Sequence, residues 1–199
     1  EAATSARDAA TQAAGAADEI DPDAKPWSGS EQIWIPVAPD LEISGWLVTA
    51  REGGTLRKAD CIVVLPGLLG DNSVLRSRDL CMALRDRGFH SLALELRGHG
   101  RTELRSPDIA YTFGTLETGD LLAVSRWLKS QSYVKRTGLM GFCWGANHAL
   151  MAAFFDGHRG PHTSLTAELR KHLPDPPNER HYDAGVMAFS PVLQFEELI

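Results

Sequence analysis

Cysteine is scarce in this sequence. The three thiols, Cys61, Cys81 and Cys143, are odd in number. They also lack the C-x-x-C spacing, which argues against both a disulfide framework and a zinc site. We therefore expect a protein of a reducing compartment, assign it to the cytoplasm, and expect no metal site.

Positive charge and long apolar runs are also in short supply. The 20 Lys and Arg residues are outnumbered by 26 Asp and Glu, which gives a formal net charge of -6. No basic cluster is interleaved with aromatic residues, so nucleic-acid binding has little support. Apolar runs such as CIVVL, residues 61–65, are far shorter than the roughly 20 residues that a membrane helix needs. We expect neither a nucleic-acid partner nor a membrane span, and the sequence leaves the oligomeric state open.

Large apolar side chains are almost missing from residues 1–30, which are rich first in Ala and then in Pro, Asp and Ser. Such a segment cannot contribute much to a core, and an isolated Ala-rich helix of this length is marginal in water. We interpret residues 1–30 as a tail or linker. The remaining residues, 31–199, belong to a chain that is 43% hydrophobic overall, which fits one globular domain.

From residue 31 onward, strand-like and helix-like patterns alternate. Residues 31–50 predict a hairpin with Pro39-Asp40 at its turn. Further strands are expected at residues 61–67, 90–98, 137–142 and 184–193, and helices at 73–89, at 116–131 and after residue 143. Residues 157–183 predict a polar surface excursion. The pattern favours an α/β fold: a mainly parallel sheet with helices on both faces and an antiparallel N-terminal hairpin.

The stretch GLMGFCWGANHAL, residues 138–150, carries a candidate active-site motif. A buried strand runs through Gly141 into Cys143 and, after Gly145, directly into a helix-like pattern. The spacing G-x-C-x-G is that of a nucleophile elbow, in which the central residue is strained and exposed while small neighbours let strand and helix approach. The N-terminus of the helix would also favour the thiolate form of Cys143. The competing interpretation is an inert buried cysteine.

Two further motifs accompany the elbow, and together they resemble the α/β-hydrolase superfamily from about residue 31 onward. LPGLLG, residues 65–70, follows a strand, and ELRGHGRT, residues 95–102, is similar to the family's Asp-x-Arg-Gly-His-Gly-x-Ser turn. The Cys elbow resembles that of dienelactone hydrolases, whereas LPGLLG is more esterase-like. The resemblance implies an oxyanion hole made by the backbone N–H groups of Leu68 and Trp144.

The remaining polar residues near these motifs are interpreted as structural. We expect Arg97, His99 and Arg101 to shape the turn in which they lie, with Glu95 standing where the family has Asp. His148, early in the predicted helix, is expected to be a packing residue rather than a base. The Trp144 side chain is expected to be a pocket wall, and LPGLLG could also be an ordinary tight turn.

No histidine occupies the place that the resemblance implies for a catalytic base. In that family the acid and the base follow the nucleophile on later strand ends. The histidines after Cys143 are His148, His158, His162, His172 and His181. Glu196 or Glu197 could be an early acid. We expect a chain that lacks the C-terminal strands of the domain; the alternative is a hydrolase-like fold that has lost its chemistry.

The leading hypothesis is an acyl hydrolase for a small-molecule ester, lactone or thioester, with Cys143 as the nucleophile and no cofactor. A non-catalytic α/β-hydrolase-like binding domain is the alternative, with the missing base in its favour. A flavodoxin-like or Rossmann nucleotide binder is the weakest hypothesis, since no glycine-rich loop follows the first strand.

Overall fold

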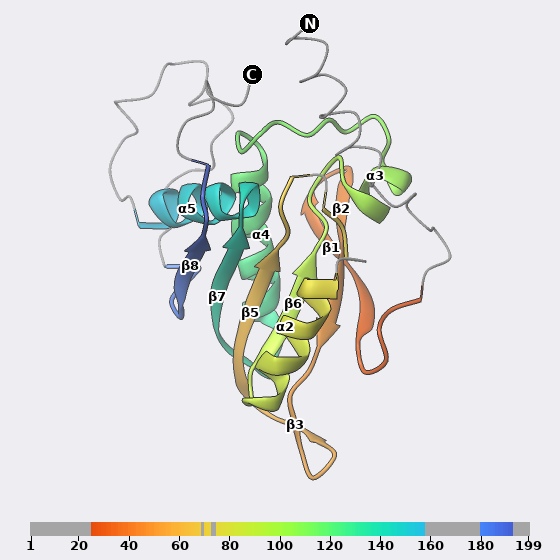
Figure 1. Cartoon of the computed structure of the whole chain (residues 1–199), viewed down its shortest axis with the longest axis vertical. Coiled ribbons are helices and arrows are strands. Elements are labelled where there is room, and N and C mark those ends of the chain that lie inside the picture. Colours follow the sequence, from red (N-terminus) through yellow and green to blue (C-terminus); the bar gives the residue numbers. More distant parts are fainter. Residues whose placement is uncertain (1–24, 69, 73–74, 158–179, 193–199) are drawn as a thin grey trace, which may run out of the picture.

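The computed structural model describes residues 25–68, 70–72, 75–157 and 180–192, and their centre is a six-stranded sheet (Figure 1). Its strands lie in the order β1-β2-β6-β5-β7-β8. A separate two-stranded ribbon, β3 and β4, projects from one end of the molecule (Figure 1). The bounds are β1 Glu31–Ala38, β2 Leu41–Val48, β3 Arg51–Glu52, β4 Thr55–Leu56, β5 Ala59–Leu65, β6 His90–Leu94, β7 Val134–Phe142 and β8 Gly185–Phe189.

The sheet is mixed, with the antiparallel part at the N-terminal side. Strand β1 pairs antiparallel with β2, which pairs antiparallel with β6. The pairs β5–β6, β5–β7 and β7–β8 are all parallel. Parallel strands need crossover connections, and helices supply them here. The predicted hairpin and mainly parallel sheet are confirmed.

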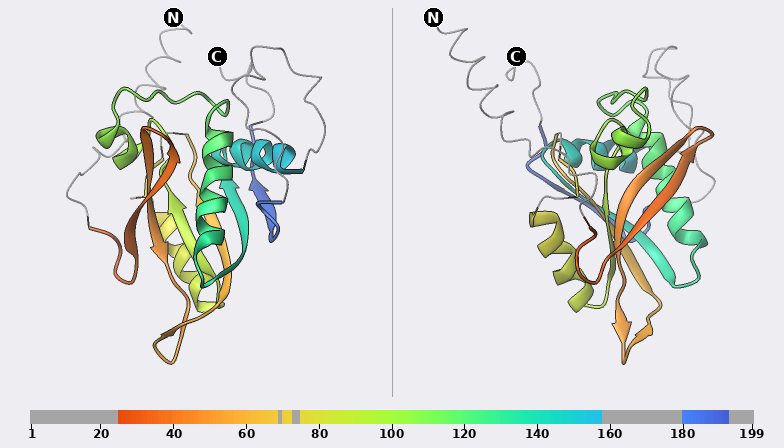
Figure 2. Two further views of the ribbon diagram at one scale, coloured as in Figure 1. Left: turned by 180° about the vertical axis from the view of Figure 1, so that it is seen from behind. Right: turned by 90° about the vertical axis from the view of Figure 1, so that its right-hand side faces the viewer.

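Helices cover both faces of the sheet (Figure 2). Helix α2, Leu75–Asp86, lies on one face, whereas α4, Glu117–Ser130, and α5, Trp144–Gly157, lie on the other. A short helix, α3, Gly100–Arg105, follows β6 near the carboxyl ends of the parallel strands. None of the helices in the described ranges has the length and apolar character needed to cross a membrane.

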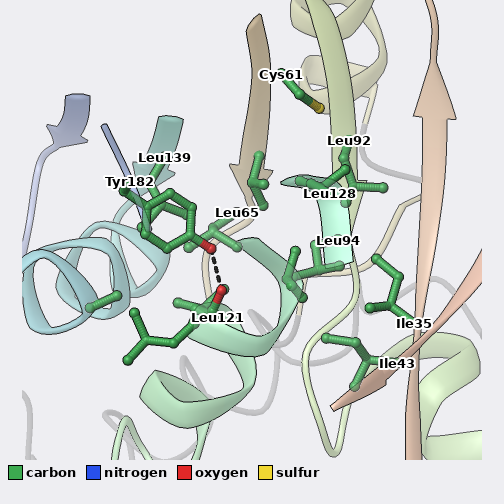
Figure 3. Packing of buried hydrophobic residues seen from close by; sticks show 14 of the residues in the cluster. Ile35, Ile43, Cys61, Leu65, Leu92, Leu94, Leu121, Leu128, Leu139 and Tyr182 are labelled. Carbon is green, nitrogen blue, oxygen red and sulfur yellow. Dashed lines mark hydrogen bonds between the residues drawn. The ribbon is translucent and has the colours of Figure 1, made fainter. Parts of the chain in front are cut away.

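The larger part of the hydrophobic core lies between the sheet and helices α4 and α5 (Figure 3). Leu121 and Leu128 of α4 meet the fully buried Leu65, Leu92 and Leu139 of three parallel strands. These strands are apolar on consecutive residues because both of their faces are covered. The Tyr182 hydroxyl donates a hydrogen bond to the Leu121 carbonyl, so the chain before β8 is held to α4.

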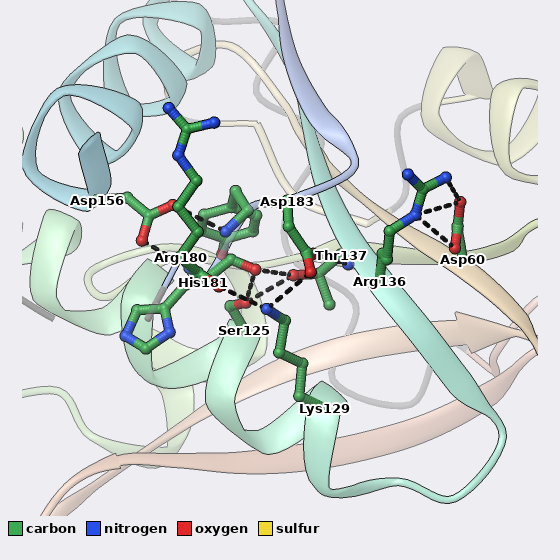
Figure 4. A network of polar contacts seen from close by, with 10 residues as sticks. Asp60, Ser125, Lys129, Arg136, Thr137, Asp156, Arg180, His181 and Asp183 are labelled. Atoms are coloured by element: carbon green, nitrogen blue, oxygen red, sulfur yellow. Dashed lines mark hydrogen bonds and ion pairs between the residues drawn. The ribbon is translucent and has the colours of Figure 1, made fainter. Parts of the chain in front are cut away.

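A network of hydrogen bonds holds the segment that precedes β8 (Figure 4). The Asp156 carboxylate accepts hydrogen bonds from the backbone N–H groups of His181, at 2.6 Å, and Tyr182, at 2.9 Å. The His181 carbonyl in turn accepts from the hydroxyls of Ser125, at 2.8 Å, and Thr137, at 2.5 Å. Residues 180–183 are therefore tied to α4, α5 and β7 together.

The structure contains elements that the sequence analysis did not predict. Helix α3 and the ribbon of β3 and β4 were not predicted, and β7 begins at Val134 rather than at Thr137. The interpretation of residues 1–30 falls mostly outside the described residues, as does most of the expected excursion at 157–183.

Candidate active site

Cys143 lies at an abrupt turn between β7 and α5. Its φ is +52°, in the left-handed region that residues other than glycine rarely adopt. Its side chain is exposed, whereas Cys61 and Cys81 are both buried. The Cys143 backbone N–H donates to the Phe189 carbonyl at 2.9 Å, and its carbonyl accepts from the Ala146 N–H at 3.0 Å. The strained backbone is thus held on both sides.

The two glycines that flank the turn have no room for a side chain. A Cβ on Gly141 would lie 2.2 Å from the Gly145 carbonyl oxygen. A Cβ on Gly145 would lie 2.2 Å from the oxygen of Pro66 and 2.8 Å from that of Leu65. These backbones approach so closely that only glycine fits. The small-residue requirement expected for an elbow is present.

The turn after β5 lies beside the Cys143 side chain. A Cβ on Gly67 would be 3.5 Å from the Cβ of Cys143 and 4.0 Å from its Sγ. A hydrogen bond from the Gly70 N–H to the Gly67 carbonyl, at 3.1 Å, closes this turn around Leu68. Trp144 is the first residue of α5, and N–H groups in a first helical turn point away from the helix body. Both expected oxyanion donors therefore belong to segments that adjoin the thiol.

Three of the four described histidines have a ring hydrogen bond to a partner other than Cys143, and the fourth, His181, lies far from Cys143. His90 bonds Ala50 and Arg57 at the far end of β6, and His99 bonds the Arg97 carbonyl. His181 lies near Thr137, roughly 16 Å along β7 from its carboxyl end. His148 is 1% exposed, and its Nε2 lies 2.6 Å from the Tyr111 hydroxyl. It is a buried packing residue, as expected.

His148 and Tyr111 titrate far from their ordinary ranges. Burial lowers the pKa of His148 to about 4, so the imidazole is neutral at pH 7. Burial, with the charge of Glu117 adding to it, raises the Tyr111 pKa, and the Trp144 indole N–H opposes this rise. The pair lines a narrow pocket next to the elbow, together with Pro66, Gly67, Gly70, Leu96, His99, Trp144 and Gly145.

The turn after β6 is fixed by two buried ion pairs. Arg97 donates two hydrogen bonds to the Asp120 carboxylate, at 2.6 and 2.7 Å, and so joins the turn to α4. The fully buried Glu95 accepts from the backbone and the guanidinium of Arg101 and from the Asn72 N–H. The structural role expected for these residues fits their contacts.

Sequence reasoning missed the segment that covers this site. Tyr111 contacts His99 and His148 edge-on, with ring centroids 4.6 and 5.6 Å apart. Phe113 lies edge-on to Trp144, with ring centroids 5.8 Å apart. The available signal was two aromatic residues, Tyr111 and Phe113, in the stretch before the helix at 117. Nothing in their spacing says which distant residues they meet.

No cluster of three metal-ligating side chains occurs within the described ranges. The described part of the site offers instead a thiol, backbone N–H groups and aromatic side chains. This set suits covalent acyl chemistry.

Comparison with known families agrees with this fold. The family described as the alpha/beta hydrolase fold matches residues 60–159, just over half of the chain. This protein belongs to the α/β hydrolase fold family. The nucleotide-binding interpretation is therefore dropped. No curated protein matches the chain.

Solved structures with a similar fold include esterases. The esterase Pf2001 of Pyrococcus furiosus is 24% identical, with a TM-score of 0.50, over 65% of this chain and 48% of that one. Est1E from Butyrivibrio proteoclasticus is 16% identical, with a TM-score of 0.50, over 61% of this chain and 44% of that one. The α/β hydrolase GrgF from Penicillium sp. sh18 is 18% identical, with a TM-score of 0.52, over 65% and 42%. The chain spans less than half the length of each of these proteins.

Proposed function

We propose that this protein is an acyl hydrolase that cleaves a carboxylic ester, lactone or thioester through Cys143. The observation that carries the proposal is the conformation of that residue: exposed, at φ +52°, between a buried strand and a helix N-terminus. Strain of this kind persists where surrounding structure enforces it, and it is concentrated at functional sites.

The reaction would proceed in two steps. The Cys143 thiolate adds to the carbonyl carbon, and the carbonyl oxygen becomes an oxyanion held by the N–H groups of Leu68 and Trp144. Collapse of this intermediate expels the alcohol, which takes up one proton, and leaves an acyl thioester on Cys143. Water, deprotonated by a base, then attacks the thioester, and the carboxylic acid and the thiolate are released.

The base for the second step is proposed to lie outside the described residues. The rings of His90, His99 and His148 bond other partners, His148 is also buried, and His181 lies beside Thr137, far from the carboxyl end of β7. A thiol without a base can be acylated, but it lacks the group that activates water. A variant in which His158, His162 and His172, the histidines outside the described residues, are all replaced by Ala should therefore give a stoichiometric burst of p-nitrophenol from p-nitrophenyl acetate, with little or no turnover.

The burst experiment separates two candidate functions. Cys143→Ala should abolish the burst, while Cys61 and Cys81 remain in the variant as internal controls for non-specific thiol acylation. The second candidate, a non-catalytic binding domain, has in its favour that no described histidine is shown to bond Cys143, and it requires no burst in either protein. Sustained turnover by the variant without His158, His162 and His172 would refute the placement of the base.

The oxyanion donors can be tested by removing single N–H groups. Leu68 is the second residue of a closed four-residue turn, a position that proline accepts, and Trp144 is the first residue of a helix, where proline is also tolerated. Leu68→Pro and Trp144→Pro should each slow acylation by about 10² to 10³-fold, the effect of losing one such donor. The matched variants Leu68→Ala and Trp144→Ala keep the backbone N–H, so their acylation rates should fall much less. Equal losses in the Pro and Ala variants would reject these donors.

A further inference from the structure

The segment between α3 and α4 crosses the carboxyl ends of the parallel strands (Figure 1). Within it, residues 111–114, here called the aromatic turn, place Phe113 in an unusual state. Its φ is +54°, in the left-handed region, and 53% of its surface is exposed. Both the strained backbone of Phe113 and the exposure of its apolar ring to water carry a free-energy cost.

Buried polar contacts enforce the strain. The Glu117 carboxylate, fully buried, accepts hydrogen bonds from the backbone N–H of Thr112 at 2.7 Å and from its hydroxyl at 2.7 Å. It also accepts from the Gly114 N–H at 2.6 Å. A carboxylate with three short donors is a strong anchor, because hydrogen bonds to charged groups are about twice as strong as neutral ones. Glu117 therefore holds the residues on both sides of Phe113.

The exposed ring is directed toward the elbow rather than toward distant surface. Phe113 lies edge-on to Trp144, the residue after Cys143, with ring centroids 5.8 Å apart and planes at 88°. Leu68, 46% exposed, lies in the turn that adjoins the Cys143 side chain from β5. The aromatic turn and the turn after β5 thus each present an exposed apolar side chain next to the segments around one thiol.

We propose that Phe113 is a specificity-determining residue, which offers its exposed face as the contact surface for an aliphatic acyl chain attached to Cys143. This inference rests on the proposed function. The ligand is an apolar chain because the ring and its neighbours Trp144 and Leu68 present apolar surface, which an acetyl group is too short to cover. Each methylene that contacts such a surface can contribute up to about 0.8 kcal/mol, or roughly fourfold in the acylation rate. Medium-length acyl groups are therefore preferred over acetyl.

The test compares burst rates with p-nitrophenyl acetate, butyrate and hexanoate. The wild-type rate should rise with chain length, and Phe113→Ala should reduce the hexanoate-to-acetate ratio by about fourfold or more, the value of at least one methylene contact. Phe113→Gly should do the same with no backbone strain, since glycine accepts φ +54°. Phe113→Leu should retain part of the preference. Phe154→Ala is the matched control: Phe154 is also 53% exposed, but α5 carries it roughly 15 Å from Trp144.

A second measurement keeps this proposal separate from the proposed function. N-Ethylmaleimide and its longer N-alkyl homologues add the Cys143 sulfur to a carbon–carbon double bond, with a solvent proton on the neighbouring carbon, so their rates need no hydrolytic machinery. Their length preference should also fall in Phe113→Ala and Phe113→Gly. If no ester gives a burst but the maleimide preference depends on Phe113, the acyl-hydrolase function fails and the contact surface stands. An unchanged chain-length profile in both series would overturn the role of Phe113.

Discussion

The backbone of Cys143 and that of Phe113 share one property: each adopts a left-handed φ without being glycine. The cost of such a conformation is about 1 to 3 kcal/mol, and it persists only when neighbouring contacts enforce it. Hydrogen bonds to Phe189 and Ala146 hold Cys143, and Glu117 holds the neighbours of Phe113. Both residues are also exposed, so a ligand can reach them.

We predict that Cys143 is alkylated before the other two thiols. Burial raises the pKa of Cys61 well above its ordinary range, with Cys81 adding to the effect, and burial raises the pKa of Cys81 to about 11. Neither side chain is accessible, and neither forms the reactive thiolate at pH 8. Brief iodoacetamide treatment followed by peptide mass mapping should find the label on Cys143. Earlier labelling of Cys61 or Cys81 would contradict the geometry of the turn.

We also predict that His148 makes the fold sensitive to acid. Its pKa falls from 6.5 to about 4 on folding, chiefly through burial, and nearby His99 lowers it further while Glu117 raises it. The unfolded chain therefore binds the extra proton first, and stability present above pH 6.5 is lost as the pH falls toward 4. Protonation of His148 should lower the free energy of unfolding by at most about 3 kcal/mol at pH 4.

Thermal unfolding at a series of pH values tests this expectation. His148→Gln removes the titrating group and keeps a polar side chain that can accept from Tyr111. Its unfolding temperature should decline less between pH 7 and pH 4 than that of the wild type. Parallel declines for the two proteins would show that His148 is not the group responsible.

At the scale of elements, the junction of β7 and α5 depends on contact between backbones. Gly145→Ala should destabilise the protein and lower Cys143 reactivity, because the new Cβ would meet the Pro66 carbonyl oxygen at 2.2 Å. Overpacking typically costs about 1 to 3 kcal/mol. Gly119→Ala in α4 is the matched control, since no atom lies within 4 Å of the added Cβ. It should be neutral or stabilising by up to about 1 kcal/mol.

Chemical denaturation gives the comparison directly. If Gly145→Ala and Gly119→Ala unfolded at the same denaturant concentration, the close approach of α5 to the β5 turn would be wrong.

The elements that sequence reasoning found and those that it missed differ in length. Apolar runs such as those of β5 and β6 are typical of strands covered on both faces, and the G-x-C-x-G spacing locates the turn after β7. Helix α3 has six residues and β3 and β4 have two each, too few for a period to become visible. The first residues of β7 were not assigned because they are mostly polar and lie outside the apolar run of the strand.

At the scale of the whole molecule, the sheet predicts a gradient of stability. Strand β5 lies between β6 and β7 and has helices on both of its faces, whereas β8 ends the described sheet and alternates between exposed and half-buried residues. Hydrogen exchange should therefore be slowest in β5 and faster in β8, although both strands are parallel to their neighbours. Mass spectrometry of exchanged peptides would show this order. Equal protection of the two strands would contradict the described sheet order.

The candidate site was only partly accessible from sequence. Cys143 and its glycines are local in the chain and could be found by spacing. Tyr111 and Phe113 meet residues more than thirty positions away, through ring contacts that no periodicity encodes. Glu117 is a further example: it accepts hydrogen bonds from Thr112 and Gly114, and the sequence gives no sign that this carboxylate is turned back onto the preceding turn.

The hydrogen bond from the Cys143 N–H to the Phe189 carbonyl has a consequence for biosynthesis. The turn at Cys143 is held by a strand residue that the ribosome adds 46 residues later, and Asn147 of α5 exchanges two hydrogen bonds with Val192. During translation, β5, β6 and β7 can assemble while the thiol is still without this support. The hydrogen bonds around Cys143 and Asn147 are therefore complete only once the chain has been made through Val192.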